Sequence, residues 1–354
     1  MTNANKLINR NTAGISADYH HDVAASLGDA FQAYLDEFHS YREPYDDELD
    51  AQLHEAYAKI KRVNKFANMK WGVPNFSPSA AGSSLRDLYE KVRKSKKDET
   101  RTPPHQRRWT AQGTALGDWL QRELLLAEKH YPKFTGKPAT FRLARTTDGY
   151  PAFEDFIYRQ HTLTYEGVDM ALMGTSDGIM EYVTEDGEVL TVGLEIKSKQ
   201  TTAARTKPYS LSAPEPKHID QCTVYSIMYG LDYFVITYVN ASKKSWAMTP
   251  EEYAENPDVR AFGVYITEEM RKEVLDRFAG VVKAVKANTP PPVDLHNWTF
   301  NNHKQAIVDG LTDAEIAQIT QTYEQTKKSR LPEYKKKPVI EAYEEITKLR
   351  GGAL

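Results

Sequence analysis

Three charged residues that could form a reactive centre lie on two neighbouring segments of the chain. Glu195 and Lys197 belong to the run 189–197, in which apolar and polar residues alternate. Because strand side chains alternate between two faces, the pattern places both charges on one face and the apolar residues on the other. Asp177 precedes the opposite arm of the same expected hairpin and should lie near the level of Glu195. Two carboxylates and a lysine suit Mg²⁺ and a phosphate substrate, whereas the plain alternative is a surface ion pair.

A polar and aromatic stripe follows on the helix expected at 216–230. His218, Gln221 and Tyr225 are spaced at i, i+3 and i+7, so they share one helix face. Apolar residues flank this stripe. It is either a partly exposed helix face or a set of side chains directed at the reactive centre.

Hydrophobic periodicity predicts the elements that would position these residues. Helices are expected at 18–70 (with a second stretch at 49–67), 85–94, 113–129 and 216–230. Strands are expected at 140–145, 153–158, 168–173, 178–183, 189–197 and 232–239. The Asp186-Gly187 pair between two alternating runs predicts a hairpin. The remainder, 247–354, is expected to be helical, with a capping box at Thr312 and Glu315.

The ordered set of motifs resembles the PD-(D/E)xK nuclease superfamily. Asp177, then Glu195-Ile196-Lys197 after 17 residues, then Gln221-x-x-x-Tyr225, is similar to the RecB-like exonuclease branch, which adds Q-x-x-x-Y to E-x-K. Two upstream segments add to the resemblance. Residues 113–121 are similar to the first motif helix of the family, and residues 77–89 to its N-terminal S…C-x-R segment.

The resemblance implies an α/β fold with a restriction-endonuclease-like core, a mixed β-sheet flanked by helices, and helical additions at both ends. It divides the chain into a helical N-terminal region (1–74), a RecB-like nuclease core (75–245) and a helical C-terminal region (246–354). The implied activity is that of a Mg²⁺- or Mn²⁺-dependent deoxyribonuclease of the phage-type, stand-alone kind. An exonuclease in DNA recombination, repair or end processing is favoured over a structure-specific endonuclease.

The same resemblance implies roles for individual residues. The catalytic residues would be Asp177, Glu195, Lys197, Gln221 and Tyr225. The metal ligands would be Asp177, Glu195 and the main-chain carbonyl of Ile196.

The chain departs from the family pattern at two places. Gly117 occupies the position where the family usually has a metal-binding histidine, and Asp118 beside it is a possible substitute ligand. Ser84 stands where iron–sulfur members have a cysteine. Because Cys222 is the sole cysteine, no Fe–S cluster, thiolate zinc site or intrachain disulfide is expected. The vacant histidine position keeps a catalytically inert, nuclease-like DNA-binding subunit open as an alternative.

A basic segment precedes the first motif helix. Residues 91–108 contain eight basic residues and two acidic ones, a local net charge of +6. This segment is either a solvated loop or a phosphate-contacting one. The residues expected to contact DNA are Lys94, Lys96, Lys97, Arg107, Arg108 and His218. Trp71, Tyr89 and Trp109 nearby belong either to the core or to a surface that stacks on unpaired bases.

Composition limits the classes of protein that remain. With 354 residues, 40 % of them hydrophobic, and a net charge of only −3, the chain can bury a core and does not coat nucleic acid by bulk charge. No apolar stretch is long enough for a membrane span, and the first six residues lack an apolar signal region. A reducing cytoplasm, of a cell or of a virus-infected host, is therefore expected. The expected partners are DNA and a recombination or single-strand-binding protein.

Overall fold

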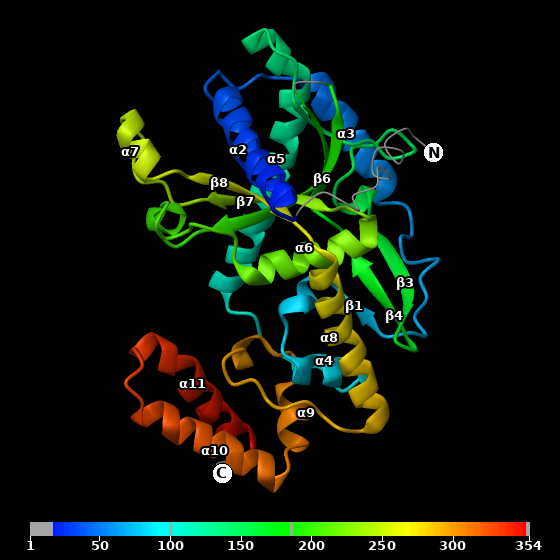
Figure 1. Cartoon of the computed structure of the whole chain (residues 1–354), viewed down its shortest axis with the longest axis vertical. Helices are drawn as coiled ribbons and strands as arrows, with labels where there is room; N and C mark the ends of the chain where they lie inside the picture. Colours follow the sequence, from blue (N-terminus) through cyan, green and yellow to red (C-terminus); the bar gives the residue numbers. More distant parts are fainter. Residues whose placement is uncertain (1–16, 100, 185–186, 352–354) are drawn as a thin grey trace. The chain divides into compact units, whose positions relative to one another are not determined.

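The computed structural model describes residues 17–99, 101–184 and 187–351 (Figure 1). The segment in which no signal region was expected, and positions 185 and 186 of the hairpin turn, lie outside the described residues. By contacts the chain forms two compact units. The first contains Met1–Met69, Thr102–Gln160 and Met173–Arg271, and the second contains Lys70–Arg101, His161–Leu172 and Lys272–Leu354. The predicted division into regions 1–74, 75–245 and 246–354 stays a prediction.

The fold is mixed α/β, and the first unit is built on a five-stranded mixed sheet. The strand order is β2-β5-β6-β7-β8. The strands are β2 (Phe141–Leu143), β5 (Gly178–Val183), β6 (Val189–Lys199), β7 (Tyr233–Asn240) and β8 (Val259–Tyr265). The pair β6–β7 is parallel, and the other three pairs are antiparallel. The carboxyl ends of β6 and β7 therefore lie at the same edge of the sheet.

Helices cover this sheet (Figure 1). They are α2 (Ala17–His39), α3 (Asp47–Ile60), α5 (Pro104–Thr135) and α6 (Pro216–Tyr229), whereas α7 (Pro250–Glu255) connects β7 to β8 and lies beyond the ends of these strands. Apolar side chains of α2, such as Leu27 and Phe31, enter one core with residues of β2, β6 and β7. Helix α2 also passes unusually close to β8, because a Cβ added to Gly263 would lie 1.6 Å from the carbonyl oxygen of Ala24. This crossing requires glycine.

Three elements differ from the sequence-based expectation. Helix α5 begins at Pro104 rather than at 113, since proline fits the first helical position, where no N–H partner is needed. The expected strand at 153–158 is a 3₁₀ turn, η2 (Glu154–Phe156), and the strand β3 (Arg159–Tyr165) follows it. The last region is not wholly helical, because β8 pairs along β7. Its partner is distant in sequence, so local periodicity does not reveal it.

The second unit contains a small mixed sheet and a helical part. Its sheet has the order β1-β4-β3, with β1 (Asn75–Phe76) and β4 (Val168–Gly174) parallel, and the first two residues of β3 and the last two of β4 belong to the first unit. The helices are α4 (Leu85–Val92), α8 (Glu268–Ala287), α9 (Lys304–Asp309), α10 (Asp313–Lys328) and α11 (Glu333–Leu349), of which the first turn of α8 belongs to the first unit. Trp298, Ile307, Val339 and Ile346 form the core under the last three helices. The predicted capping box at Thr312 and Glu315 is confirmed.

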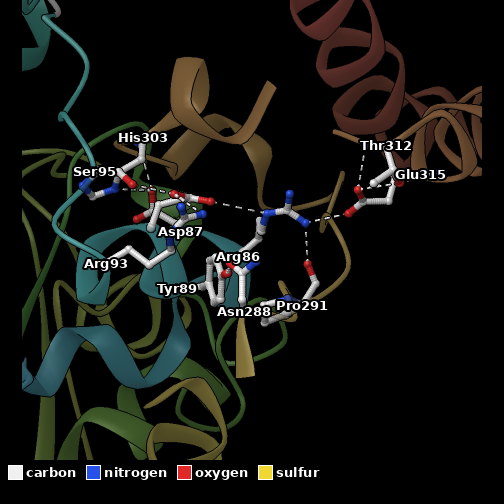
Figure 2. Close-up of polar contacts among 11 residues, drawn as sticks. Arg86, Asp87, Tyr89, Arg93, Ser95, Asn288, Pro291, His303, Thr312 and Glu315 are labelled. Carbon is white, nitrogen blue, oxygen red and sulfur yellow. Dashed lines mark hydrogen bonds and ion pairs between the residues drawn. The ribbon is translucent and has the colours of Figure 1, made fainter. Parts of the chain in front are cut away.

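Buried charges join α4 to the helical part of this unit (Figure 2). Arg86 is 1 % exposed, and its Nη1 donates to Glu315 at 2.6 Å and to the carbonyl of Pro291 at 2.9 Å. Asp87 accepts hydrogen bonds from the backbone N–H and the Nδ1 of His303, both at 3.0 Å. Loss of one partner would leave a buried charge uncompensated, which is strongly destabilising. The 77–89 segment therefore contributes structural contacts here, and Tyr89 is fully buried rather than available for stacking.

Candidate active site

The hairpin of β5 and β6 brings Asp177 beside Glu195. Gly178 pairs with Leu194, so the residues just outside this pair face each other. The backbone N–H of Ile196 donates to Asp177 Oδ2 at 2.6 Å, and Ser176 Oγ donates to the carbonyl of Leu194 at 3.0 Å. These two bonds fix the segment that precedes β5 against β6.

Lys197 connects this pair of carboxylates to helix α6. Its Nζ forms an ion pair with Glu195 and donates to Gln221 Oε1 at 2.9 Å. Gln221 Nε2 in turn donates to the Tyr225 hydroxyl at 3.1 Å. Tyr225 is 4 % exposed, and its hydroxyl orients Gln221.

Burial dominates the electrostatics of this cluster. Burial, with a further contribution from Asp177, raises the pKa of Glu195 to about 8, against the opposing effect of Lys197. Burial also raises the pKa of Asp177, although the Ile196 N–H and Lys197 oppose it. Burial alone would lower the pKa of Lys197, but the charges of Glu195 and Asp177 outweigh it and raise that pKa. With both carboxyls ionised and Lys197 charged, one negative charge remains uncompensated.

The residues present fit a hard divalent cation. Glu195 is 1 % exposed, and its Oε2 has no hydrogen-bond partner in the described part of the chain. A buried carboxylate oxygen without a partner is costly, and a cation would satisfy it. Among residues 17–99, 101–184 and 187–351, no group of three or more His, Cys, Asp or Glu side chains is arranged to hold a metal. A metal here would therefore need main-chain carbonyl and water ligands beside Asp177 and Glu195.

Asp118 lies near Glu154, a residue that sequence reasoning missed. Burial raises the pKa of Asp118, and Lys61 opposes this. Burial likewise raises the pKa of Glu154, and the charges of Asp118 and Asp177 add to the effect. Glu154 therefore lies within electrostatic reach of both Asp118 and Asp177.

The backbone at Glu154 is also unusual. Its φ of +44° is in the left-handed region, which glutamate rarely adopts. Its N–H donates to the carbonyl of Ser176 at 3.2 Å, and its own carbonyl accepts from Thr175. The apolar run around Glu154 suggested a strand, and no sequence signal marked this turn.

Gln121 on α5 is a second residue whose place the sequence did not reveal. It is 1 % exposed, and its Nε2 donates to the carbonyl of Asp177 at 2.7 Å. Its Oε1 has no partner among the described residues. Helix α5 also approaches β6 closely, because a Cβ on Gly113 would lie 3.1 Å from Ser198 Oγ. The segment 113–121 thus packs against β6 and the Asp177 backbone.

His218 lies on the same face of α6 as Gln221, beside Lys197. Tyr238 pairs with Lys197 across β6 and β7, and its hydroxyl lies 2.9 Å from His218 Nδ1. The backbone N–H of Glu215 donates to that hydroxyl at 2.8 Å, which leaves the Tyr238 O–H free to donate to His218. Burial and the nearby charge of Lys197 lower the pKa of His218 to about 3. This lowered pKa favours the neutral form of His218, which accepts from the Tyr238 hydroxyl at Nδ1 when its hydrogen is on Nε2.

The residues expected to contact DNA are distributed over both units. Lys94, Lys96 and Lys97 belong to the second unit, and Arg107 and Arg108 to the first turns of α5 in the first unit. Lys96 forms an exposed ion pair with Glu99 at 3.0 Å.

Comparison with known proteins gives structural likeness alone. No protein-family model matches the chain, and no curated protein matches it. Among solved structures, an alkaline exonuclease from Laribacter hongkongensis is 11 % identical, with a TM-score of 0.34 over 61 % of this chain and 89 % of that one. Its complex with dAMP is 13 % identical, with a TM-score of 0.34 over 62 % and 90 %. A phage-related exonuclease from Haemophilus somnus 129PT is 10 % identical, with a TM-score of 0.30 over 60 % and 94 %. Scores this low do not assign an activity to the chain.

No helix within the described ranges is long and apolar enough to cross a bilayer.

Proposed function

We propose that the chain is a metal-dependent deoxyribonuclease of the PD-(D/E)xK superfamily, in its RecB-like branch. One observation carries the proposal: Asp177, Glu195 and Lys197 converge on one buried centre, and Gln221 of the next helix binds Lys197. The plain alternative, an ion pair on a hairpin edge, does not account for a Glu195 side chain that is 1 % exposed.

Asp177, Glu195 and the main-chain carbonyl of Ile196 would hold the cation, Mg²⁺ or Mn²⁺. Bound there, the cation would activate a water molecule and stabilise negative charge on the phosphate. The partnerless Glu195 oxygen supports this set. Asp118 stays a candidate ligand on the resemblance alone, and the charge of Glu154 interacts with the charges of Asp118 and Asp177. No Fe–S cluster is part of the proposal.

Lys197 would orient the attacking water and oppose charge that develops on the phosphate. Its raised pKa keeps it charged, which suits electrostatic stabilisation rather than removal of a proton. Gln221 would hold the ammonium in place and Tyr225 would hold Gln221, so we propose Tyr225 as a positioning residue.

The substrate would be DNA, contacted through Lys94, Lys96, Lys97, Arg107, Arg108 and His218. We propose an exonuclease in recombination, repair or end processing, working in the cytoplasm with a recombination or single-strand-binding protein as partner. One experiment distinguishes this exonuclease from a structure-specific endonuclease and from an inert DNA-binding subunit.

That experiment is digestion of end-labelled linear and closed circular DNA, single- and double-stranded, with Mg²⁺, Mn²⁺ or EDTA. Metal-dependent loss of linear substrates alone supports the exonuclease. Nicking of circles indicates an endonuclease. Binding without cleavage under every condition, by the parent protein and by Glu195→Gln alike, overturns the proposed catalysis.

A further inference from the structure

Three segments distant in sequence meet at the carboxyl ends of β6 and β7. Just beyond these ends, the Ala241 N–H donates to the carbonyl of Lys199 at 2.8 Å, and Ser242 Oγ donates to the carbonyl of Gln200 at 3.0 Å. The third segment is the start of α5, since Gln200 Nε2 donates to the carbonyl of Trp109 at 3.0 Å.

The loop after β6 is also tied to this edge. Asn240 is fully buried, and its Nδ2 donates to the carbonyl of Thr202 at 3.0 Å and to Thr206 Oγ1 at 2.9 Å. These hydrogen bonds therefore fix the position of Thr206, and with it the start of the segment that contains Tyr209, beside the end of β7.

Each of the three segments exposes one large aromatic side chain. Trp109 is 46 % exposed, Tyr209 is 78 % exposed, and Trp246 is fully exposed. Single exposed aromatics are ordinary on protein surfaces. These three lie on segments that are all hydrogen-bonded to one edge of the sheet, and packing within the first unit does not explain their exposure.

Basic side chains accompany each aromatic. Arg107 and Arg108 precede Trp109, Arg205 and Lys207 precede Tyr209, and Lys243 and Lys244 precede Trp246. Lys207 Nζ lies 5.9 Å from the Tyr209 ring centroid. Lys243 is paired with Asp258, but Arg107, Arg108, Arg205 and Lys244 have no carboxylate partner in the described part of the chain. These four cations are available to a ligand.

A cleft lies at the carboxyl end of β6. It has a volume of about 390 Å³, and Lys199, Arg205, Ser210 and Ser212 line it together with Glu215. Lys199 lies two residues beyond Lys197 on the same face of β6. Glu215 also lines the cleft, but ion pairs with Lys199 and Lys217 offset its charge. Phosphate groups passing Lys197 could continue along the cleft without meeting an unpaired carboxylate.

We propose that Trp109, Tyr209 and Trp246, with the four unpaired cations, bind an unpaired DNA strand that continues from the catalytic centre. We call this set the aromatic rim. Unpaired bases offer free faces on which aromatic rings stack, whereas bases in a duplex are already stacked and paired. The cations alone would bind the phosphates of single-stranded and of duplex DNA alike, so the aromatic side chains would determine the preference for single-stranded DNA. This inference rests on the proposed nuclease function, because that function supplies the DNA.

The test measures binding rather than cleavage. Fluorescence anisotropy of an oligothymidylate of about 20 nucleotides and of a blunt duplex of about 20 base pairs is recorded at several salt concentrations. The protein is the full chain, both as the parent in EDTA and as the Glu195→Gln variant. Trp109→Ala, Tyr209→Ala and Trp246→Ala are compared with Tyr45→Ala, a matched control that is 83 % exposed in the same unit but outside the rim.

We expect each rim aromatic variant to bind the single strand about 5- to 150-fold more weakly, with an unchanged salt slope. Binding of the duplex should change less, and Tyr45→Ala should bind as the parent. Arg107→Ala with Arg108→Ala should instead flatten the single-strand salt slope by roughly 0.7 for each phosphate that the variant no longer binds. Far-UV circular dichroism checks that these exposed substitutions leave the fold intact.

Parent-like binding of the single strand by all three aromatic variants would overturn the rim. Equal losses for duplex and single strand would overturn its preference for unpaired DNA. Failure of the proposed function gives a different result, in which the rim variants weaken binding although the parent cleaves no DNA with any metal.

Discussion

The side-chain oxygen of Gln221 accepts a hydrogen bond of 2.9 Å from the ammonium of Lys197. This bond connects the helix that follows the hairpin to the charged face of β6. The amide nitrogen of Gln221 donates to the Tyr225 hydroxyl, so the three side chains form one chain of contacts. Such a chain acts as a unit, and its members should not contribute additively.

A double-mutant cycle on Gln221 and Tyr225 should show this coupling. Gln221→Ala frees the Lys197 ammonium, and we expect kcat to fall by about 10²-fold with little change in KM. Tyr225→Phe removes one hydrogen bond and should cost at most about tenfold. The double variant should be no slower than Gln221→Ala, as measured in single-turnover cleavage. Losses that multiply would show that Tyr225 acts independently of Gln221.

Lys197 itself should tolerate no replacement. We expect Lys197→Met to lower the cleavage rate by about 10²–10³-fold, because a positioned cation is removed where negative charge develops. Lys197→Arg should rescue little, since a planar guanidinium does not fit the space of an ammonium held between Glu195 and Gln221. Single-turnover rates with saturating Mg²⁺ check this. An arginine variant within a few-fold of the parent would contradict the assigned role.

The sequence predicted those parts of the fold that depend on local pattern. Strand β5 lies at the predicted residues, and β6 extends the predicted run by two residues. Both were predictable because apolar and polar residues alternate along a half-buried strand. The spacing of His218, Gln221 and Tyr225 likewise placed them on one helix face. What these side chains do chemically stays a prediction.

Features set by distant contacts were not predictable. Strand β8 depends on pairing with β7 and on the close passage of α2, neither of which leaves a local signal. Glu154 lies in a left-handed turn, whereas the residues around it are typical of a strand. The sequence showed Gln121 only as part of a motif helix. Its hydrogen bond to the Asp177 carbonyl joins residues that are distant in sequence, so the sequence did not predict it.

Metal binding should be measurable without DNA. At a Mg²⁺ concentration of about 100 times Kd, the free energy of unfolding should rise by about 2.7 kcal/mol if only the folded state binds the ion. Glu195→Gln and Asp177→Asn should abolish this rise and also lower cleavage by at least about 10²-fold, while DNA affinity stays within a few-fold. Denaturant unfolding with MgCl₂, against NaCl of equal ionic strength, gives the measurement. Asp148→Asn, an exposed carboxylate in the same unit, is the control and should retain the full rise.

The buried His218 should make the protein sensitive to mild acid. Its pKa is about 3 in the folded protein and 6.5 ordinarily, so between these values the unfolded chain binds a proton that the folded one does not. Stability from this group is therefore complete above pH 6.5 and declines as the pH falls toward 3. We expect a loss of at least about 1 kcal/mol between pH 7.5 and pH 5, because the pH then falls about 1.5 units below the ordinary pKa.

The matched variant for this effect is His218→Asn, which can still accept from Tyr238 but does not titrate. Its free energy of unfolding should fall by at least about 1 kcal/mol less than that of the parent over the same pH change. Urea unfolding at the two pH values measures both proteins, and other acid-sensitive groups cancel in the comparison. Identical declines would mean that His218 is already protonated at pH 5.

The basic segment before α5 offers the last prediction, which concerns Lys94, Lys96 and Lys97. If all three contact phosphates, replacing them with alanine should weaken DNA binding and flatten the slope of log affinity against log salt by about 2–3. Lys96 is already paired with Glu99, so its share should be the smallest, and Lys96→Ala alone should change the slope least. Cleavage at saturating DNA should remain, because the substitutions leave Asp177, Glu195 and Lys197 untouched. Anisotropy titrations at several salt concentrations decide the matter: an unchanged slope in the triple variant would identify the segment as a solvated loop that contacts no DNA.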